Sequence, residues 1–207
     1  MASVSQGTCG DTNNGYALAI DGAPIETRMF SIATLGYAPD EGGLQYWVSN
    51  INTDPSWTPT TVAQSFFDQP LVEQQYPAEQ SNDVLIEALY QNPFGRSADT
   101  EGLAYWQGEL NSGRMARNQM VIALIEGGWV NPDAAADMAR FGNLIAVGLA
   151  FAAYQAEHGI QYSQLTDTER SALRQAGRKV LASMTEDETT RDAAIASIPA
   201  LLESFVN

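Results

Sequence analysis

Apolar residues recur every three or four positions along most of the chain. Between Pro24 and Leu35 they stand at Ile25, Met29 and Ile32, and similar stripes follow further on. This spacing places the apolar side chains on one face of a helix. No convincing run alternates between apolar and polar residues, as a half-buried strand would. The pattern therefore predicts an all-α protein.

One stretch of this pattern occurs twice. Gly36–Trp47 returns as Gly95–Trp106, and six positions match at a constant offset of 59 residues. The matched pairs are Gly36 and Gly95, Asp40 and Asp99, Gly43 and Gly102, Leu44 and Leu103, Tyr46 and Tyr105, and Trp47 and Trp106. Two glycines, an acid and two aromatic residues do not stay in register by chance. We therefore predict a duplicated structural unit.

Each copy predicts the order helix, loop, helix, turn, helix. Gly36 and Gly95 are expected to end the first helix of their copy, because glycine is common just after a helix. Asp40 and Asp99 are expected to cap the second helix. In the first copy, a third helix is expected to start after Trp57.

The chain after the second copy also predicts helices. The stretch from Ala134 towards His158 is apolar nearly all round, which is typical of a buried central helix. Thr166–Glu169 has the spacing of a capping box before another helix. A last helix, from Ala193 to Phe205, is expected to be interrupted or restarted at Pro199.

These elements suggest the domain organisation. Residues 1–23 are expected to be irregular, and residues 24–207 are expected to form a single helical domain. Within it, repeat one covers about 24–76, repeat two about 81–130, and the C-terminal helices 131–207. The expected architecture is a helical bundle of two related helix-loop-helix repeats, followed by a long buried helix and C-terminal helices.

Composition narrows the choice of partners. The formal net charge is −15, from 25 acids and 10 bases, and Lys179 is the single lysine. Such a chain repels phosphate backbones and anionic lipids, so nucleic acid is not an expected partner. No apolar run approaches the roughly 18 residues of a membrane span, so no membrane insertion is expected. Cys9 is the single cysteine, which excludes an intrachain disulfide.

The repeated element resembles the DUF4214 family, a domain of secreted and surface proteins of bacteria that often stands beside calcium-binding RTX repeats. The motif reads Leu89-Tyr90, Phe94-Gly95-Arg96, Asp99, Gly102-Leu103 and Tyr105-Trp106 in the second copy. The first copy departs from it, with Leu35-Gly36-Tyr37 where Phe-Gly-Arg is expected. The resemblance extends over about residues 25–207 and implies no general activity. A looser similarity links the chain to the helical linker domains of phycobilisomes, which act as scaffolds.

Tyr46, Trp47, Tyr105 and Trp106 are the candidate ligand-binding residues. They could form an aromatic platform on which sugar rings or peptides stack. They could instead anchor the loops in the core, with their polar atoms bonded to neighbouring groups. The second interpretation is favoured, because a packing unit is duplicated within one chain more often than a binding site is.

Asp40 and Asp99 are the candidate metal ligands. No cofactor is expected. Calcium is the candidate ion, since oxygen ligands in flexible loops suit it. Neither loop has the density of acids that an EF-hand supplies. Helix capping is the favoured interpretation, because it explains each aspartate without a metal ion. Arg96 is expected to form a salt bridge or a carbonyl contact within its loop, in preference to binding an anion. His158, the single histidine, is expected to interact with the end of the long helix.

The sequence shows no motif of a hydrolase, a metalloprotease or a P-loop protein, so we expect no catalytic residues and no enzyme. The leading hypothesis is a secreted or cell-surface structural protein that self-assembles or binds other surface proteins. No Sec-type signal is visible, and the acidity and the apolar last helix are compatible with type I secretion. A carbohydrate- or peptide-binding module is the alternative, and a small enzyme with an unrecognised carboxylate site is a third.

Overall fold

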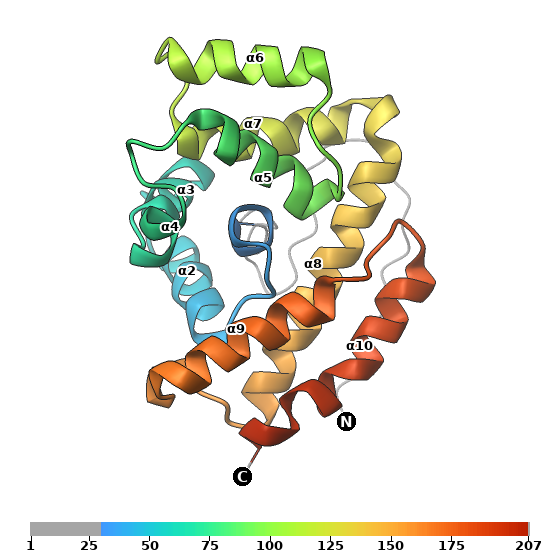
Figure 1. Cartoon of the computed structure of the whole chain (residues 1–207). Helices are drawn as coiled ribbons and strands as arrows, with labels where there is room; N and C mark the ends of the chain where they lie inside the picture. Colours follow the sequence, from blue (N-terminus) through green and yellow to red (C-terminus); the bar gives the residue numbers. More distant parts are fainter. Residues whose placement is uncertain (1–29, 207) are drawn as a thin grey trace.

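The computed structural model describes residues 30–206. The expected irregular segment 1–23, Cys9 and the start of the first helix lie outside it. The described residues form helices and no strand, so the all-α fold is confirmed for them (Figure 1). In chain order the helices are η1 (Ser31–Leu35), α2 (Glu41–Thr53), α3 (Pro59–Phe67), α4 (Pro70–Gln75), α5 (Asn82–Phe94), α6 (Thr100–Asn111), α7 (Arg117–Val130), η2 (Pro132–Ala134), α8 (Ala135–Glu157), η3 (Tyr162–Gln164), α9 (Asp167–Leu181), α10 (Glu188–Leu202) and η4 (Glu203–Phe205).

The two copies have the predicted order of helices. The first copy consists of η1, α2 and α3, and the second of α5, α6 and α7. Equivalent helices pack on each other, since η1 lies against α5 and α3 lies against α7. The short helix α4 follows the first copy and has no predicted counterpart. It begins at Pro70, whose missing N–H suits a first helical turn.

Gly36 and Gly95 end η1 and α5, as the sequence predicts. Their φ angles are 68° and 70°, in the left-handed region where a side chain is strained. Both also lie against a neighbour. A Cβ atom at Gly36 would lie 2.7 Å from Oδ1 of Asn92, and one at Gly95 would lie 3.0 Å from the guanidinium of Arg140. The repeated glycines therefore turn the chain and allow close packing.

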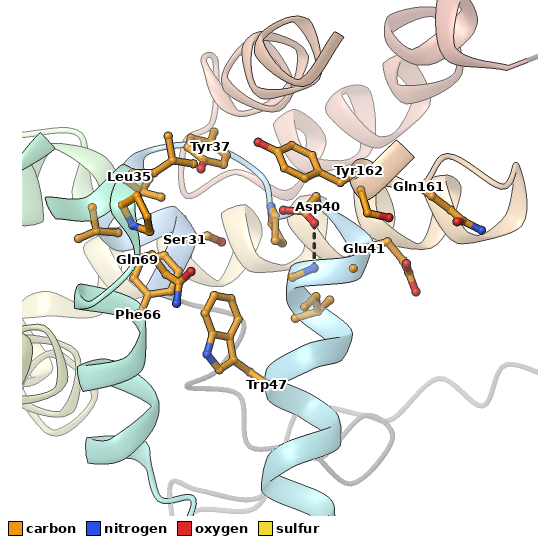
Figure 2. A pocket seen from close by; sticks show the side chains of 18 residues that line it. Ser31, Leu35, Tyr37, Asp40, Glu41, Trp47, Phe66, Gln69, Gln161 and Tyr162 are labelled. Atoms are coloured by element: carbon orange, nitrogen blue, oxygen red, sulfur yellow. Dashed lines mark hydrogen bonds between the residues drawn. The ribbon is translucent and has the colours of Figure 1, made fainter. Parts of the chain in front are cut away.

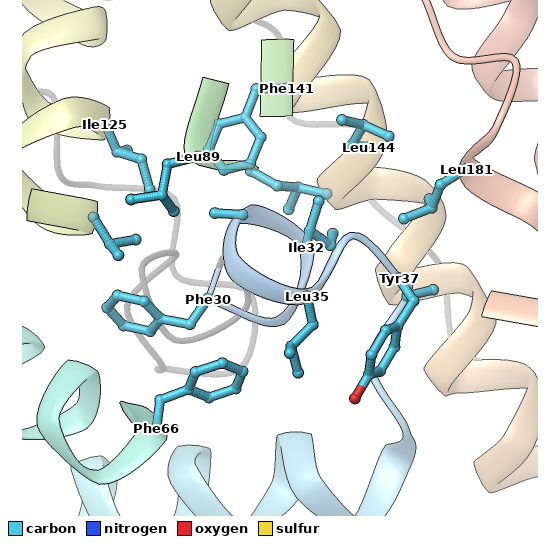
Figure 3. Packing of buried hydrophobic residues seen from close by; sticks show 14 of the residues in the cluster. Phe30, Ile32, Leu35, Tyr37, Phe66, Leu89, Ile125, Phe141, Leu144 and Leu181 are labelled. Carbon is cyan, nitrogen blue, oxygen red and sulfur yellow. The ribbon is translucent and has the colours of Figure 1, made fainter. Parts of the chain in front are cut away.

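Helix α8 is the predicted buried helix. Its residues Phe141, Leu144, Val147 and Phe151 are almost fully buried. They meet Phe30 and Ile32 of the η1 turn in one cluster that joins the two copies to the C-terminal helices (Figure 3). The η1 turn thus lies at the centre of the molecule, seen end-on in blue in Figure 1.

An 18-residue window within Pro132–Glu157 has a mean hydropathy of 1.2, so by length and composition alone this stretch is apolar enough to cross a membrane. The core accounts for much of this apolarity, because α8 packs against α5, α7, α9 and α10. A buried core helix passes the same test of composition as a membrane span. That the chain does not insert into a membrane stays a prediction.

The C-terminal helices differ from the prediction at one point. The capping box of Thr166 and Glu169 starts α9 as expected. Helix α10, however, begins at Glu188 and continues through Pro199, so the predicted interruption there was wrong. Ile198 and Leu202 are buried on either side of the proline, and this packing holds the helix together where one backbone hydrogen bond is missing.

Candidate functional site

Asp40 and Asp99 cap α2 and α6 with the same geometry. In each, one carboxylate oxygen accepts a hydrogen bond at 2.8 Å, from the backbone N–H of Gly43 in the first copy and of Gly102 in the second. Their environments differ. Burial raises the pKa of Asp40, whereas the hydrogen bond from Gly102 lowers the pKa of the exposed Asp99. The two caps are therefore equivalent in structure but not in electrostatics.

Among residues 30–206, no three acidic, histidine or cysteine side chains come together in a group that could hold a metal ion. The two aspartates lie at the starts of different helices and serve there as caps. Calcium binding at Asp40 or Asp99 stays an untested prediction.

The four candidate aromatic residues divide into two kinds. Trp106 is 7% exposed, and its Nε1 donates a hydrogen bond of 3.1 Å to the hydroxyl of Tyr90. Trp47 is half-buried against Phe66, with ring centroids 5.1 Å apart, and its Nε1 lies 3.4 Å from Oγ of Ser65. The tryptophans therefore act as anchors.

The two tyrosines point outward. Tyr46 is 54% exposed and Tyr105 is 57% exposed. Each touches the edge of its neighbouring tryptophan, at centroid distances of 5.8 Å and 4.9 Å. Any ligand on this surface would meet one tyrosine per copy and not a Tyr-Trp pair.

The other motif residues also serve packing. Leu44 is buried, and Leu103 packs half-buried against the core. Arg96 forms an ion pair of 2.6 Å with Asp137 at the start of α8, and its guanidinium lies 5.3 Å from the ring centroid of Tyr90. Within the loop, Arg96 makes only the carbonyl contact, donating to the oxygen of Ser97 at 3.2 Å. Its salt bridge leaves the loop and joins the second copy to the long helix.

His158 ends α8, as its place in the sequence suggests. Its Nδ1 lies 2.9 Å from the carbonyl oxygen of Tyr154, and the two rings stack with centroids 3.8 Å apart. These contacts lie within the last turn of the helix. Both contacts of His158 therefore help to hold the end of α8.

A cavity of about 660 Å³ lies beside the first copy (Figure 2). Its walls come from η1, the loop to α2, the start of α2, Phe66 of α3, the start of α4, and η3. Leu35, Trp47, Phe66 and Val72 supply apolar wall, while Asp40 reaches the cavity from the start of α2. The sequence analysis did not predict this cavity.

The duplication explains where the cavity lies. In the second copy, the side chain of Tyr90 lies beneath the start of α6, with its hydroxyl next to Gly102 and Trp106. Shifting these three positions back by 59 residues gives Ser31, Gly43 and Trp47, and all three line the cavity. The first copy therefore has a small hydroxyl where the second has a buried phenol ring.

Gln155 is a polar residue at this site that the sequence analysis missed. It is fully buried on α8, and its Oε1 accepts the backbone N–H of Glu41 at 3.3 Å. Its Nε2 lies 3.4 Å from the carbonyl oxygen of Pro39 and 3.1 Å from that of Phe151. Gln155 thus fixes the loop that carries Asp40. The available signal was an amide side chain next to the apolar run of α8, a signal that Asn143 on the same helix shares.

The difference between the copies makes a testable prediction about two equivalent glycines. Gly102→Ala is expected to destabilise the protein more than Gly43→Ala. A Cβ atom at Gly102 would lie 2.8 Å from the Tyr90 hydroxyl, so the ring has to move away from Trp106. Losing that buried hydrogen bond costs about 1 kcal/mol. At Gly43 the nearest contact is the capping carboxylate of Asp40, at 3.1 Å.

Urea unfolding of both variants measures this difference. The capping carboxylate is close in both copies, 3.1 Å from the new Cβ at Gly43 and 3.3 Å at Gly102, so that contact cancels in the comparison. Equal losses of unfolding free energy would contradict the assignment of Tyr90 and Ser31 as equivalent positions.

Comparison with known families identifies part of the chain. The fold and the two packed copies define an all-α repeat protein, and the family model described as Domain of unknown function (DUF4214) matches residues 63–128. The predicted resemblance is confirmed for that stretch, which contains α5, α6 and nearly all of α7. No curated protein and no solved structure matches the chain.

Proposed function

We propose that this protein is a structural protein of the cell surface or the extracellular space, and that it self-associates through the junction of α7 and α8. The observation that carries the proposal is an exposed apolar surface at that junction. Val130 is 82% exposed and Trp129 is 47% exposed. We call these two residues and the groove beside them the α7–α8 surface.

The groove beside Trp129 measures about 460 Å³. Its lining contains no charged side chain and is formed by Gly128, Trp129, Val130, Asn131, Pro132, Ala135, Met138, Ala139 and Gly142. The chain as a whole carries a net charge of −15. An uncharged apolar surface on such an acidic protein has the composition of the centre of a protein–protein interface.

A second copy of the chain is the proposed partner. The α7–α8 surface presents two projecting side chains, Trp129 and Val130, next to an apolar groove. Two copies related by a twofold axis can each insert these side chains into the groove of the other, as a self-complementary interface requires. The equal negative charges oppose this contact, so salt or calcium ions that screen them are expected to strengthen it.

The extracellular location is proposed from the sequence. The high acidity, the single lysine and the resemblance of the motif to DUF4214 support it. Helix α10 packs against α8 and α9 in the folded protein. If the last helix serves as an export signal, it is therefore recognised before the chain folds.

Sedimentation velocity tests self-association. The wild-type protein is expected to form dimers or larger species at micromolar concentration, more strongly at high salt or with calcium. The double variant Trp129→Gln, Val130→Gln is expected to remain a monomer with unchanged helix content, because the apolar contact area at the centre of the interface is lost.

The matched control is Tyr105→Gln, Val84→Gln, which removes an exposed aromatic and an exposed valine elsewhere on the surface. It is expected to associate like the wild type. A wild-type protein that stays monomeric under all conditions would contradict the proposal. So would a control variant that dissociates as completely as the double variant.

A further inference from the structure

The cavity beside the first copy has the size and composition of a ligand site. Its volume of about 660 Å³ lies within the range of small-molecule pockets, roughly 300–1,000 Å³. Trp47, Phe66, Leu35 and Val72 form an apolar wall. Figure 2 shows Trp47 on the opposite side of the cavity from Tyr37 and Tyr162, with Asp40 between them.

Three residues in the polar part of the cavity can accept hydrogen bonds from a ligand. Asp40 uses one carboxylate oxygen to cap α2, which leaves its second oxygen without a partner among residues 30–206. Tyr37 is 7% exposed, and its hydroxyl makes no hydrogen bond to a described residue. Ser31 is also buried, and it lines the cavity. Burial raises the pKa of Tyr37 to about 12, so its hydroxyl stays neutral and can accept or donate.

The charges around the cavity favour a cation. Two acids, Asp40 and Glu41, line it, and the lining contains no lysine, arginine or histidine. Three arginines contact lining residues from outside the cavity. Arg174 donates to the hydroxyl of Tyr162, Arg170 donates to the carbonyl oxygens of Tyr162 and Ser163, and Arg178 lies 5.1 Å from the ring centroid of Tyr37, but none of them lines the cavity. A partly desolvated carboxylate gains most from a charged hydrogen-bond donor. The net charge of −15 also concentrates cations near the protein.

We propose that this cavity binds a primary amine that carries an apolar group. The ammonium group donates hydrogen bonds to Asp40, Tyr37 and Ser31, and the apolar group lies against Trp47, Phe66 and Leu35. The aromatic rings add attraction for a cation. Ser31 keeps the site open, because the equivalent residue of the second copy, Tyr90, fills that space with its ring. This site is separate from the α7–α8 surface and does not depend on self-association.

Isothermal titration calorimetry on the full chain tests the proposal, with 2-phenylethylammonium chloride as the probe. The wild-type protein is expected to bind one equivalent. The neutral analogue 2-phenylethanol and the anion 3-phenylpropionate carry the same ring. Both are expected to bind at least about tenfold more weakly, because the alcohol lacks the charged donor and the carboxylate repels Asp40.

Three variants locate the binding site. Asp40→Asn keeps a helix cap, since asparagine caps well, but removes the charge, so affinity for the amine is expected to fall about tenfold or more. Ser31→Tyr is expected to abolish binding by filling the cavity. Asp99→Asn, the same change at the equivalent cap of the second copy, is expected to leave binding unchanged.

Several results would overturn the proposal. One is the absence of saturable binding of the amine by the wild type at millimolar concentration. Others are equal affinity for the amine and the alcohol, or equal affinity of Asp40→Asn and Asp99→Asn for the amine. Circular dichroism confirms that each variant is folded. If Ser31→Tyr does not fold, the comparison of Asp40→Asn with Asp99→Asn still decides the outcome.

Discussion

Phe141→Ala is expected to lower the free energy of unfolding by about 3–5 kcal/mol, the cost of truncating a fully buried aromatic side chain. Phe141 is completely buried on α8, and its ring lies 6.3 Å from that of Phe94 on α5. Helix α8 also packs against η1, so a cavity here would weaken the cluster that unites both copies with the C-terminal helices. Equilibrium unfolding in urea, followed by circular dichroism, measures the loss.

A matched control is Tyr154→Ala, on the same helix but only partly buried and stacked on His158. Its cost is expected to be clearly smaller. If Phe141→Ala were no more damaging than Tyr154→Ala, α8 could not be the centre of the core.

Tyr90→Ser is expected to cost about 3 kcal/mol or more, because a large buried ring is removed and a cavity remains. Tyr90 packs edge-on against Phe94, with ring centroids 5.9 Å apart, and accepts the hydrogen bond from Trp106. The substitution gives the second copy the residue that stands at the equivalent position of the first. The first copy has α4 and η3 beside this space, whereas the second copy depends on the Tyr90 ring to fill it.

Tyr105→Ser is the control for this prediction. Tyr105 lies on α6 next to Trp106, but more than half of its side chain is exposed. Its loss is expected to change the free energy of unfolding by less than about 0.5 kcal/mol, as is usual for surface positions. The two unfolding curves should therefore separate widely. Overlapping curves would argue against Tyr90 as a buried support of α6.

The sequence predicts the helical class, the duplication and the local ends of the helices well. These depend on signals between near neighbours: glycines that take a left-handed conformation and acids that accept N–H groups three residues on. Gly36, Gly95, Asp40 and Asp99 all do what their spacing predicts. Local chemistry decides such features, and one sequence is enough to identify them.

Features set by distant parts of the chain could not be predicted in this way. Helix α10 runs through Pro199 because α8 and α9 pack against it, and local signals alone favoured a break. Gln155 bonds to groups more than a hundred residues away. The short helix α4 contains too few residues for a periodic signal.

The candidate site contains one feature that the sequence could predict and one that it could not. Consecutive residues on a helix point about 100° apart, so Tyr46 and Trp47 could not both face the core, and neither could Tyr105 and Trp106. The cavity could not be predicted from the repeat, because positions that match between the copies do not mark it. Its origin is a position that differs, Ser31 opposite Tyr90.

The most direct test of this account is the stability of Ser31→Tyr. If the first copy has an unfilled space where the second has a tyrosine, the new ring enters it beside Gly43 and Trp47. The free energy of unfolding in urea is then expected to equal or exceed that of the wild type. A well-packed core would instead lose about 1–3 kcal/mol on such an insertion. A loss of that size would contradict the account.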